Sequence, residues 1–182
     1  MNAFEDIVAL YLEEEGYWVR QSVKVEKISK EDKRAIGQRT MPTPEVDIVA
    51  LNVKKNELLL VEVKSYLDSQ GVDFDSLTGK YKKLAGRYRL FNHKTFRDIL
   101  TERLREEYLE KGLIKKNTEI NYGLAAGKIY TGEESQINVY FKKKGWKLFL
   151  PEQIKAKIRE LSKKSWEDNL VTITTKLVLR GE

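Results

Sequence analysis

The chain has 182 residues, a formal net charge of +6 at pH 7, no cysteine and one histidine. This length predicts a single domain, residues 1–182, that buries its core without disulfides. The missing cysteines exclude thiolate metal sites and the single histidine excludes multi-histidine sites, so oxygen-ligand metal chemistry remains, while the positive charge favours a polyanionic partner.

The first third of the chain predicts a helix, a strand and a hairpin. Apolar residues recur at helical spacing over residues 3–15, and a loose alternation over 17–28 predicts a strand. The polar stretch 29–44 contains two prolines near its end and predicts a loop. Two runs rich in β-branched residues and leucine, 46–51 and 58–63, predict the strands of a hairpin because the residues between them favour a turn.

The rest of the chain predicts helices and strands in alternation. In chain order we expect an acidic irregular stretch at 67–79, helices at 80–91 and 94–111, strands at 120–130, 136–141 and 146–150, a helix that begins at Pro151, and a final strand at 170–179. No internal repeat or long linker interrupts this order. The pattern therefore predicts an α/β fold with a sheet flanked by helices.

Three charged residues of the predicted hairpin form the candidate reactive cluster. Strand alternation places Glu62 and Lys64 on one face of the second strand. Asp47 and Glu62 are equidistant from the point between Lys54 and Lys55, so a symmetric hairpin sets the two carboxylates opposite each other. Facing like charges cost roughly 0.2–1 kcal/mol. A divalent cation such as Mg²⁺ would neutralise them, and Lys64 could then orient a water or offset charge on a phosphate.

A fourth residue, Glu5, lies at the edge of the apolar stripe of the first predicted helix. From there its carboxylate could reach the same site and hold a second cation or a water. The alternative interpretation is a surface hairpin whose charges face water, because an aspartate, a glutamate and a lysine at this spacing occur by chance in many basic proteins. We favour a site because Asp47 and Glu62 interrupt otherwise apolar strands.

The order of Glu5, Asp47 and Glu62-Val63-Lys64 resembles the PD-(D/E)xK nuclease superfamily, which has the restriction-endonuclease-like fold. Residues 3–66 are similar in particular to archaeal Holliday-junction resolvases. The resemblance implies an αβββαβ core, with a mixed sheet flanked by helices. It also implies that the acids bind Mg²⁺ or Mn²⁺, that the lysine assists the attacking water, and that the backbone carbonyl of Val63 is a metal ligand.

This chain departs from the family pattern in two places. The proline of the motif immediately precedes the aspartate in the family, whereas Pro44 lies three residues before Asp47 here. After residue 66 the chain has a helical insertion and an extra C-terminal helix and strand in comparison with a minimal resolvase. The resemblance therefore implies nuclease chemistry but no specificity for junctions.

Residues 80–97 form a basic segment with seven lysines and arginines and no acid. Aromatic residues alternate with these cations, which is typical of surfaces that hold phosphates and stack bases. The alternative is a helix with a solvated basic face and its aromatics in the core. The candidate nucleic-acid-binding residues are Lys80, Lys82, Lys83, Arg87 and Arg89.

The leading hypothesis is a Mg²⁺- or Mn²⁺-dependent nuclease that hydrolyses DNA, with RNA not excluded. The alternatives are a non-catalytic nucleic-acid-binding module on the same fold and a structural protein with an incidental basic face. Cleavage of both strands would favour a homodimer, because each copy has one apparent site. The chain has neither a long apolar run nor a recognisable signal peptide, so we expect a cytoplasmic protein with no membrane partner.

Overall fold

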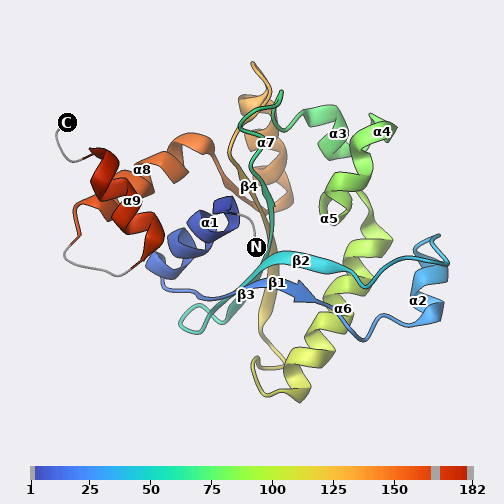
Figure 1. Ribbon diagram of the computed structural model, residues 1–182. Coiled ribbons are helices and arrows are strands. Elements are labelled where there is room, and N and C mark those ends of the chain that lie inside the picture. The colour runs from blue at the N-terminus through green and yellow to red at the C-terminus, as the bar shows by residue number, and fades with distance from the viewer. Residues whose placement is uncertain (1–2, 165–168, 180–182) are drawn as a thin grey trace.

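The computed structural model describes residues 3–164 and 169–179, which form a five-stranded mixed sheet with helices on both faces (Figure 1). The strands follow chain order across the sheet: β1 (Trp18–Lys24), β2 (Glu45–Asn52), β3 (Glu57–Lys64), β4 (Glu119–Ala126) and β5 (Lys147–Phe149). The first three strands are antiparallel, and β3–β4 and β4–β5 are parallel. The predicted α/β class is thus confirmed.

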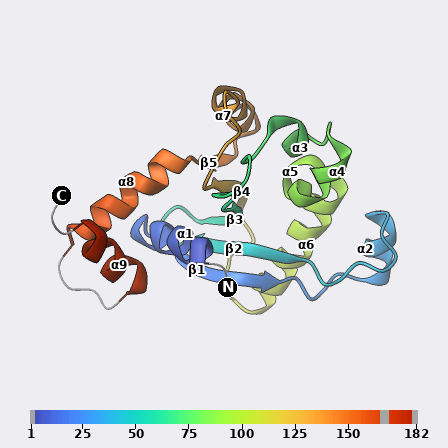
Figure 2. The same ribbon diagram turned by 45° about the horizontal axis from the view of Figure 1, so that its top comes forward.

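The helices lie in two groups on opposite faces of the sheet (Figures 1 and 2). One group comprises α1 (Ala3–Glu14), α8 (Pro151–Ser162) and α9 (Leu170–Leu179). The other comprises α3 (Phe74–Thr78), α4 (Lys82–Ala85), a 3₁₀ turn (Gly86–Tyr88), α5 (Arg89–Asn92), α6 (Lys94–Glu110) and α7 (Glu134–Lys144), and α2 (Lys30–Ala35) lies beside α6. None of these described helices is long and apolar enough to cross a membrane.

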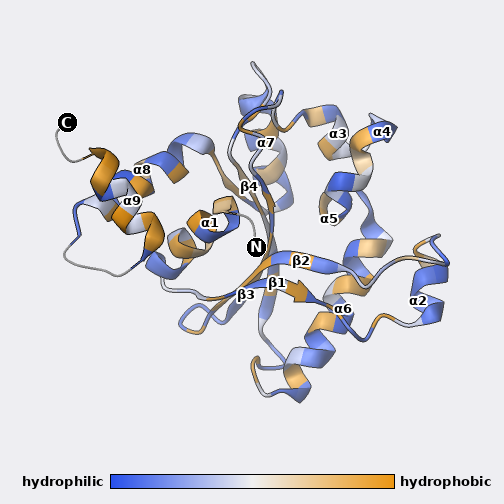
Figure 3. Ribbon diagram, viewed as in Figure 1, coloured by the Kyte–Doolittle hydropathy of each residue, from blue (hydrophilic) through white to orange (hydrophobic). Residues whose placement is uncertain are grey.

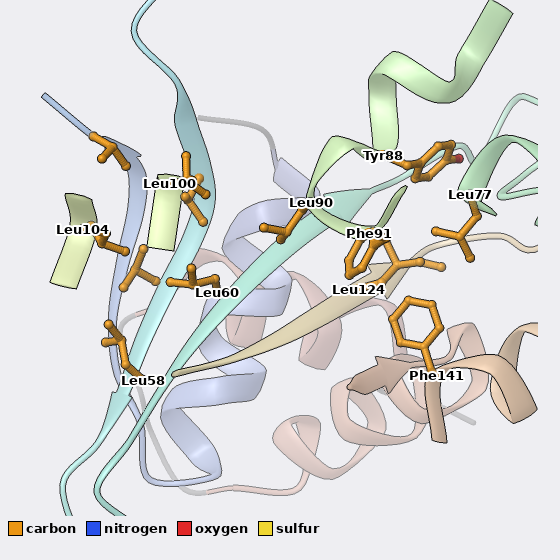
Figure 4. Packing of buried hydrophobic residues seen from close by; sticks show 14 of the residues in the cluster. Leu58, Leu60, Leu77, Tyr88, Leu90, Phe91, Leu100, Leu104, Leu124 and Phe141 are labelled. Carbon is orange, nitrogen blue, oxygen red and sulfur yellow. The ribbon is translucent and has the colours of Figure 1, made fainter. Parts of the chain in front are cut away.

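Strand alternation divides the core into two layers. Leu58 and Leu60 of β3 face α6, where they pack with Leu100 and Leu104 (Figure 4). The intervening residues, Leu59, Val61 and Val63, face α1 on the opposite side of the sheet. Full burial of each such side chain stabilises the fold by roughly 1.5–3 kcal/mol. The central strand is therefore fixed from both faces.

The predicted hairpin has the predicted register. β2 and β3 pair from Asn52–Glu57 at the turn to Ile48–Val61, so each pair is symmetric about the point between Lys54 and Lys55. Asn56 has a φ of +51°, a left-handed conformation that asparagine tolerates better than most residues. The register places Asp47 one step beyond the last pair, next to Glu62.

Two predicted strands, 136–141 and 170–179, are helices in the structure. In α7, Ile137 and Phe141 are one helical turn apart and both are buried, and a helix is the usual connection between parallel strands such as β4 and β5. In α9, the side chain of Asn169 accepts the backbone N–H groups of Val171 and Thr172, and the helix packs against α8. Tertiary contacts outweigh the β propensity of both segments.

Short helices also occur in stretches expected to be irregular. Within 29–44, Ser29 and Asp32 form a capping box that begins α2. Within 67–79, Asp73 caps α3. The helix predicted at 80–91 is instead divided into α4, the 3₁₀ turn and α5. The segment that follows β3 therefore consists of several short helices and not of one continuous helix.

A partly buried ion pair holds α2 against α6. The helix is hydrophilic (Figure 3), and Asp32 is its buried residue. Arg103 of α6 donates from Nε to Asp32 Oδ2 at 2.9 Å and from Nη2 to Oδ1 at 3.0 Å. These hydrogen bonds lower the pKa of Asp32 from its ordinary value of 3.8 to about 2. The pair anchors the loop that leads into β2.

We predict that Asp32→Asn lowers the free energy of unfolding at neutral pH by roughly 1–3 kcal/mol, because the guanidinium loses a charged acceptor. Asp32 titrates lower in the folded chain than in the unfolded one, so its contribution is present above pH 3.8 and is lost as the pH falls through about 2. Urea unfolding at neutral pH and near pH 2 would measure this difference. Asp98→Asn, in an exposed pair with Lys94, is the control and should change stability by less than about 0.5 kcal/mol.

Candidate active site

The structure brings together three of the four candidate catalytic side chains. The Lys64 ammonium forms an ion pair with Glu62 Oε1 and lies 3.8 Å from Asp47 Oδ2. The side chains of Lys64, Glu62 and Asp47 are 16%, 20% and 24% exposed, so the cluster is partly buried but accessible to solvent. It lies where the hairpin ladder ends.

The backbone opens at this cluster because β2 leaves its regular pairing at Asp47. On the β1 side, the pairs Gln21–Ile48 and Val23–Val46 flank an unpaired Ser22 and Asp47, and Ser22 has a φ of +50°. On the β3 side the last pair is Ile48–Val61. The register is the same on both sides of Ser22 and Asp47, so the pairing with β1 is interrupted for one residue on each strand and then resumes.

The Asp47 carboxylate replaces the missing ladder contact. Its Oδ2 accepts the backbone N–H of Val63 at 2.7 Å. The N–H and C=O groups of one strand residue point to the same neighbouring strand. The Val63 carbonyl therefore faces the gap beside Asp47, which is where a metal held by that carboxylate would lie.

Glu5 approaches from the N-terminus of α1. Gly127, just after β4, leaves no room for a side chain, because a Cβ there would lie 2.3 Å from Ser65 O and 3.2 Å from Phe4 Cζ. The first turn of α1 thus lies against the ends of β3 and β4. From this position the charge of Glu5 contributes to the raised pKa of Glu62. Glu5 also lies in the first turn of its helix, where an acid is favourable to the helix dipole.

The site concentrates negative charge. Burial raises the pKa of Glu62, and the charges of Asp47 and Glu5 add to this effect, whereas Lys64 opposes it. Burial disfavours the charged form of Lys64, but Glu62 and Asp47 outweigh it and raise the pKa of the ammonium. Lys64 is therefore a cation at neutral pH. One ammonium faces the two carboxylates of Asp47 and Glu62, and the charge of Glu5 acts on Glu62 as well, which is an imbalance that a divalent cation would correct.

The donor set fits Mg²⁺ better than a metal enclosed entirely by protein ligands. Within residues 3–164 and 169–179, no group of three or more acids or histidines is close enough to hold a metal. Mg²⁺ commonly takes only one or two carboxylates and completes its octahedron with water and substrate phosphate. Asp47 Oδ1 and Glu62 Oε2 have no hydrogen bond to a described residue, and with the Val63 carbonyl they provide such a partial set.

The structure separates the five candidate nucleic-acid-binding residues. Arg87 and Arg89 line a pocket of about 270 Å³ that Glu62 also lines. Lys80, Lys82 and Lys83 are exposed outside that pocket, and Lys80 pairs with Asp75 at 3.6 Å. Two of the five thus lie in a pocket that reaches the carboxylate cluster.

Sequence reasoning missed Tyr66. Its backbone φ is +43°, and its hydroxyl accepts from Arg87 Nη1 at 3.4 Å. β3 ends at Lys64 and the left-handed backbone at Tyr66 departs from the strand, so two-residue alternation did not indicate this residue. Gln38 and Met41, which contact Arg89 from the loop before β2, gave no sequence signal.

Comparisons with protein-family models, with curated protein sequences and with solved structures gave no match to this chain.

We predict that Mn²⁺ or Mg²⁺ raises the thermal unfolding temperature of the protein, because a cation that binds only the folded cluster stabilises it. At a metal concentration of a hundred times the dissociation constant, this linkage amounts to about 2.7 kcal/mol. Asp47→Asn should abolish the shift, whereas Asp98→Asn should keep it. Calorimetry with a metal titration measures both. An equal shift in Asp47→Asn would place the metal elsewhere.

Proposed function

We propose that the protein is a metal-dependent nuclease of the PD-(D/E)xK type that hydrolyses phosphodiester bonds in DNA. The observation that carries this proposal is the convergence of Asp47, Glu62 and Lys64 at the point where β2 separates from β3. Three charged groups from two strands meet there beside a backbone carbonyl with no ladder partner on β2. A purely structural hairpin has no need of this arrangement, because like charges opposite each other are destabilising.

The order of elements supports the same proposal. When the short helix α2 between β1 and β2 and the short helices after β3 are set aside, helix α1, the antiparallel strands β1–β3, helix α6 and the parallel strand β4 follow the order αβββαβ. The short helices α3–α5 then form an insertion between β3 and α6. The elements from β5 onward extend the sheet and cover its α1 face. This topology is compatible with a restriction-endonuclease-like core.

Each residue of the cluster would have a separate role in the reaction. Asp47, Glu62 and the Val63 carbonyl would hold Mg²⁺ or Mn²⁺, which supplies Lewis-acid stabilisation of charge that develops on the phosphate. Lys64 now neutralises Glu62. Once the carboxylates are engaged elsewhere, its ammonium is available to bind a phosphoryl oxygen or to orient the attacking water. Glu5 would hold a water or second cation at the open side.

A non-catalytic nucleic-acid-binding module is the second candidate. It is favoured by the absence of a group of three metal-binding side chains among the described residues. In that case Lys64 and Glu62 would serve as a permanent ion pair, while the basic residues still contacted phosphates. The two candidates differ in metal-dependent cleavage and not in binding.

We expect Asp47→Asn, Glu62→Gln and Lys64→Met each to reduce Mg²⁺-dependent DNA cleavage by a factor of at least about 10², because each removes a charge that faces the reacting phosphate. A gel assay on single-stranded, duplex, flapped and branched DNA, with Mg²⁺, Mn²⁺ or chelator, measures this. Lys94→Met also removes one charge, on the exposed N-terminal turn of α6, and should retain activity. Unchanged cleavage in all three variants would contradict the assignment.

A further inference from the structure

A second feature of the site is the pocket beside Glu62. It lies between the loop that leads into β2 and the segment formed by the 3₁₀ turn and α5. Its volume is about 270 Å³. This is close to the lower end of the range of about 300–1,000 Å³ that is typical of small-ligand pockets.

Arg89 is a half-buried cation in this pocket without an acidic partner. Its guanidinium donates to Gln38 Oε1 at 3.2 Å and to Met41 Sδ at 3.2 Å, and it stacks 3.9 Å from the centre of the Phe96 ring. These partners are all neutral. Within the described chain, no carboxylate forms an ion pair with Arg89, and burial lowers the pKa of the guanidinium.

An uncompensated, partly buried charge is costly unless a ligand neutralises it. Arg97 provides a comparison, because it is an arginine with a structural role in the same fold. Its guanidinium also stacks on aromatic rings, those of Tyr122 and Trp146, but it donates to the carbonyls of Leu90 and Phe91 and thereby satisfies the end of α5. Among the residues that the structure describes, the Arg89 guanidinium donates only to side chains and to no backbone carbonyl. It is thus placed for an anion that enters from outside.

The remaining walls suit a base. Pro42 and Pro44 provide apolar surface, Arg87 lines the pocket together with Arg89, and Glu45 lies at its lining as well. Enzymes that take up an unstacked nucleotide combine such apolar walls with cations for the phosphate. Because Glu62 also lines the pocket, a nucleotide held there would be adjacent to the phosphate at the carboxylate cluster.

We propose that this pocket binds one unpaired nucleotide next to the phosphate that is cut, with Arg89 on its phosphate and the apolar wall against its base. This inference rests on the proposed nuclease function, which supplies the position of the reacting phosphate. It predicts a substrate with at least one unpaired nucleotide at the cleavage point, either within a strand or at its end.

The test is a binding measurement by fluorescence anisotropy without divalent metal, so that no cleavage is needed. Three probes are used: a fully paired duplex, the same duplex with a one-nucleotide bulge, and one with a one-nucleotide overhang. We expect Arg89→Met to weaken binding of the bulged or the overhang probe by about tenfold, the effect of one charge-assisted contact to phosphate, and to leave the paired duplex within about twofold. The probe that responds shows whether the nucleotide is internal or terminal.

Arg97→Met is the matched control, since it removes the same charge from the same type of aromatic stack. It should lower the unfolding temperature without selective loss of the unpaired probes. Arg89→Met should leave the unfolding temperature unchanged or raise it, because it removes a charge without a carboxylate partner. An abasic residue at the unpaired position should weaken wild-type binding, since a base is expected in the pocket.

Equal losses on all three probes, or full affinity for the abasic probe, would overturn the pocket assignment. Neither result affects cleavage by the Asp47 cluster, so the nuclease proposal would stand. Conversely, a selective loss in Arg89→Met without any metal-dependent cleavage would retain the pocket in a binding module and remove the nuclease.

Discussion

The site depends on one hydrogen bond, from the backbone N–H of Val63 to the carboxylate of Asp47. An amide that leaves a β-ladder in a partly buried position must find another acceptor, or its desolvation destabilises the fold. Asp47 provides that acceptor, which allows β2 to separate from β3 without leaving the amide unpaired. The same bond fixes the carboxylate beside Glu62 and leaves the Val63 carbonyl facing the gap. The same hydrogen bond therefore stabilises the local backbone and positions the candidate metal ligands.

The fold tolerates the electrostatic cost of this cluster because β3 is packed on both faces. Leu58 and Leu60 are buried against α6, and Leu59 and Val61 against α1. Their combined burial exceeds the repulsion between a few partly solvated carboxylates, which is of the order of 1 kcal/mol per pair. A rigid strand can thus present charged groups that would not otherwise remain together. Unfavourable charge held by a well-packed scaffold is typical of functional sites.

The pocket beside Glu62 is built by elements far from the hairpin. The ion pair between Asp32 and Arg103 fixes α2 on α6 and so fixes the loop that follows. That loop carries Gln38 and Met41 to Arg89, which comes from the insertion after β3. The pocket therefore joins residues separated by about fifty positions in the chain. Its shape depends on a contact that lies outside both the pocket and the carboxylate cluster.

The sequence by itself determined the hairpin, its register and the meeting of Asp47, Glu62 and Lys64, because two-residue alternation and a short turn are local properties. It also determined α1 and the α/β class. Tertiary structure decided that 136–141 and 170–179 are helices, although both segments contain β-branched residues. The first connects the parallel strands β4 and β5, and the second packs against α8. Tertiary structure alone decided the position of Glu5 and the pocket around Arg89. Such contacts join distant segments, so no local pattern encodes them.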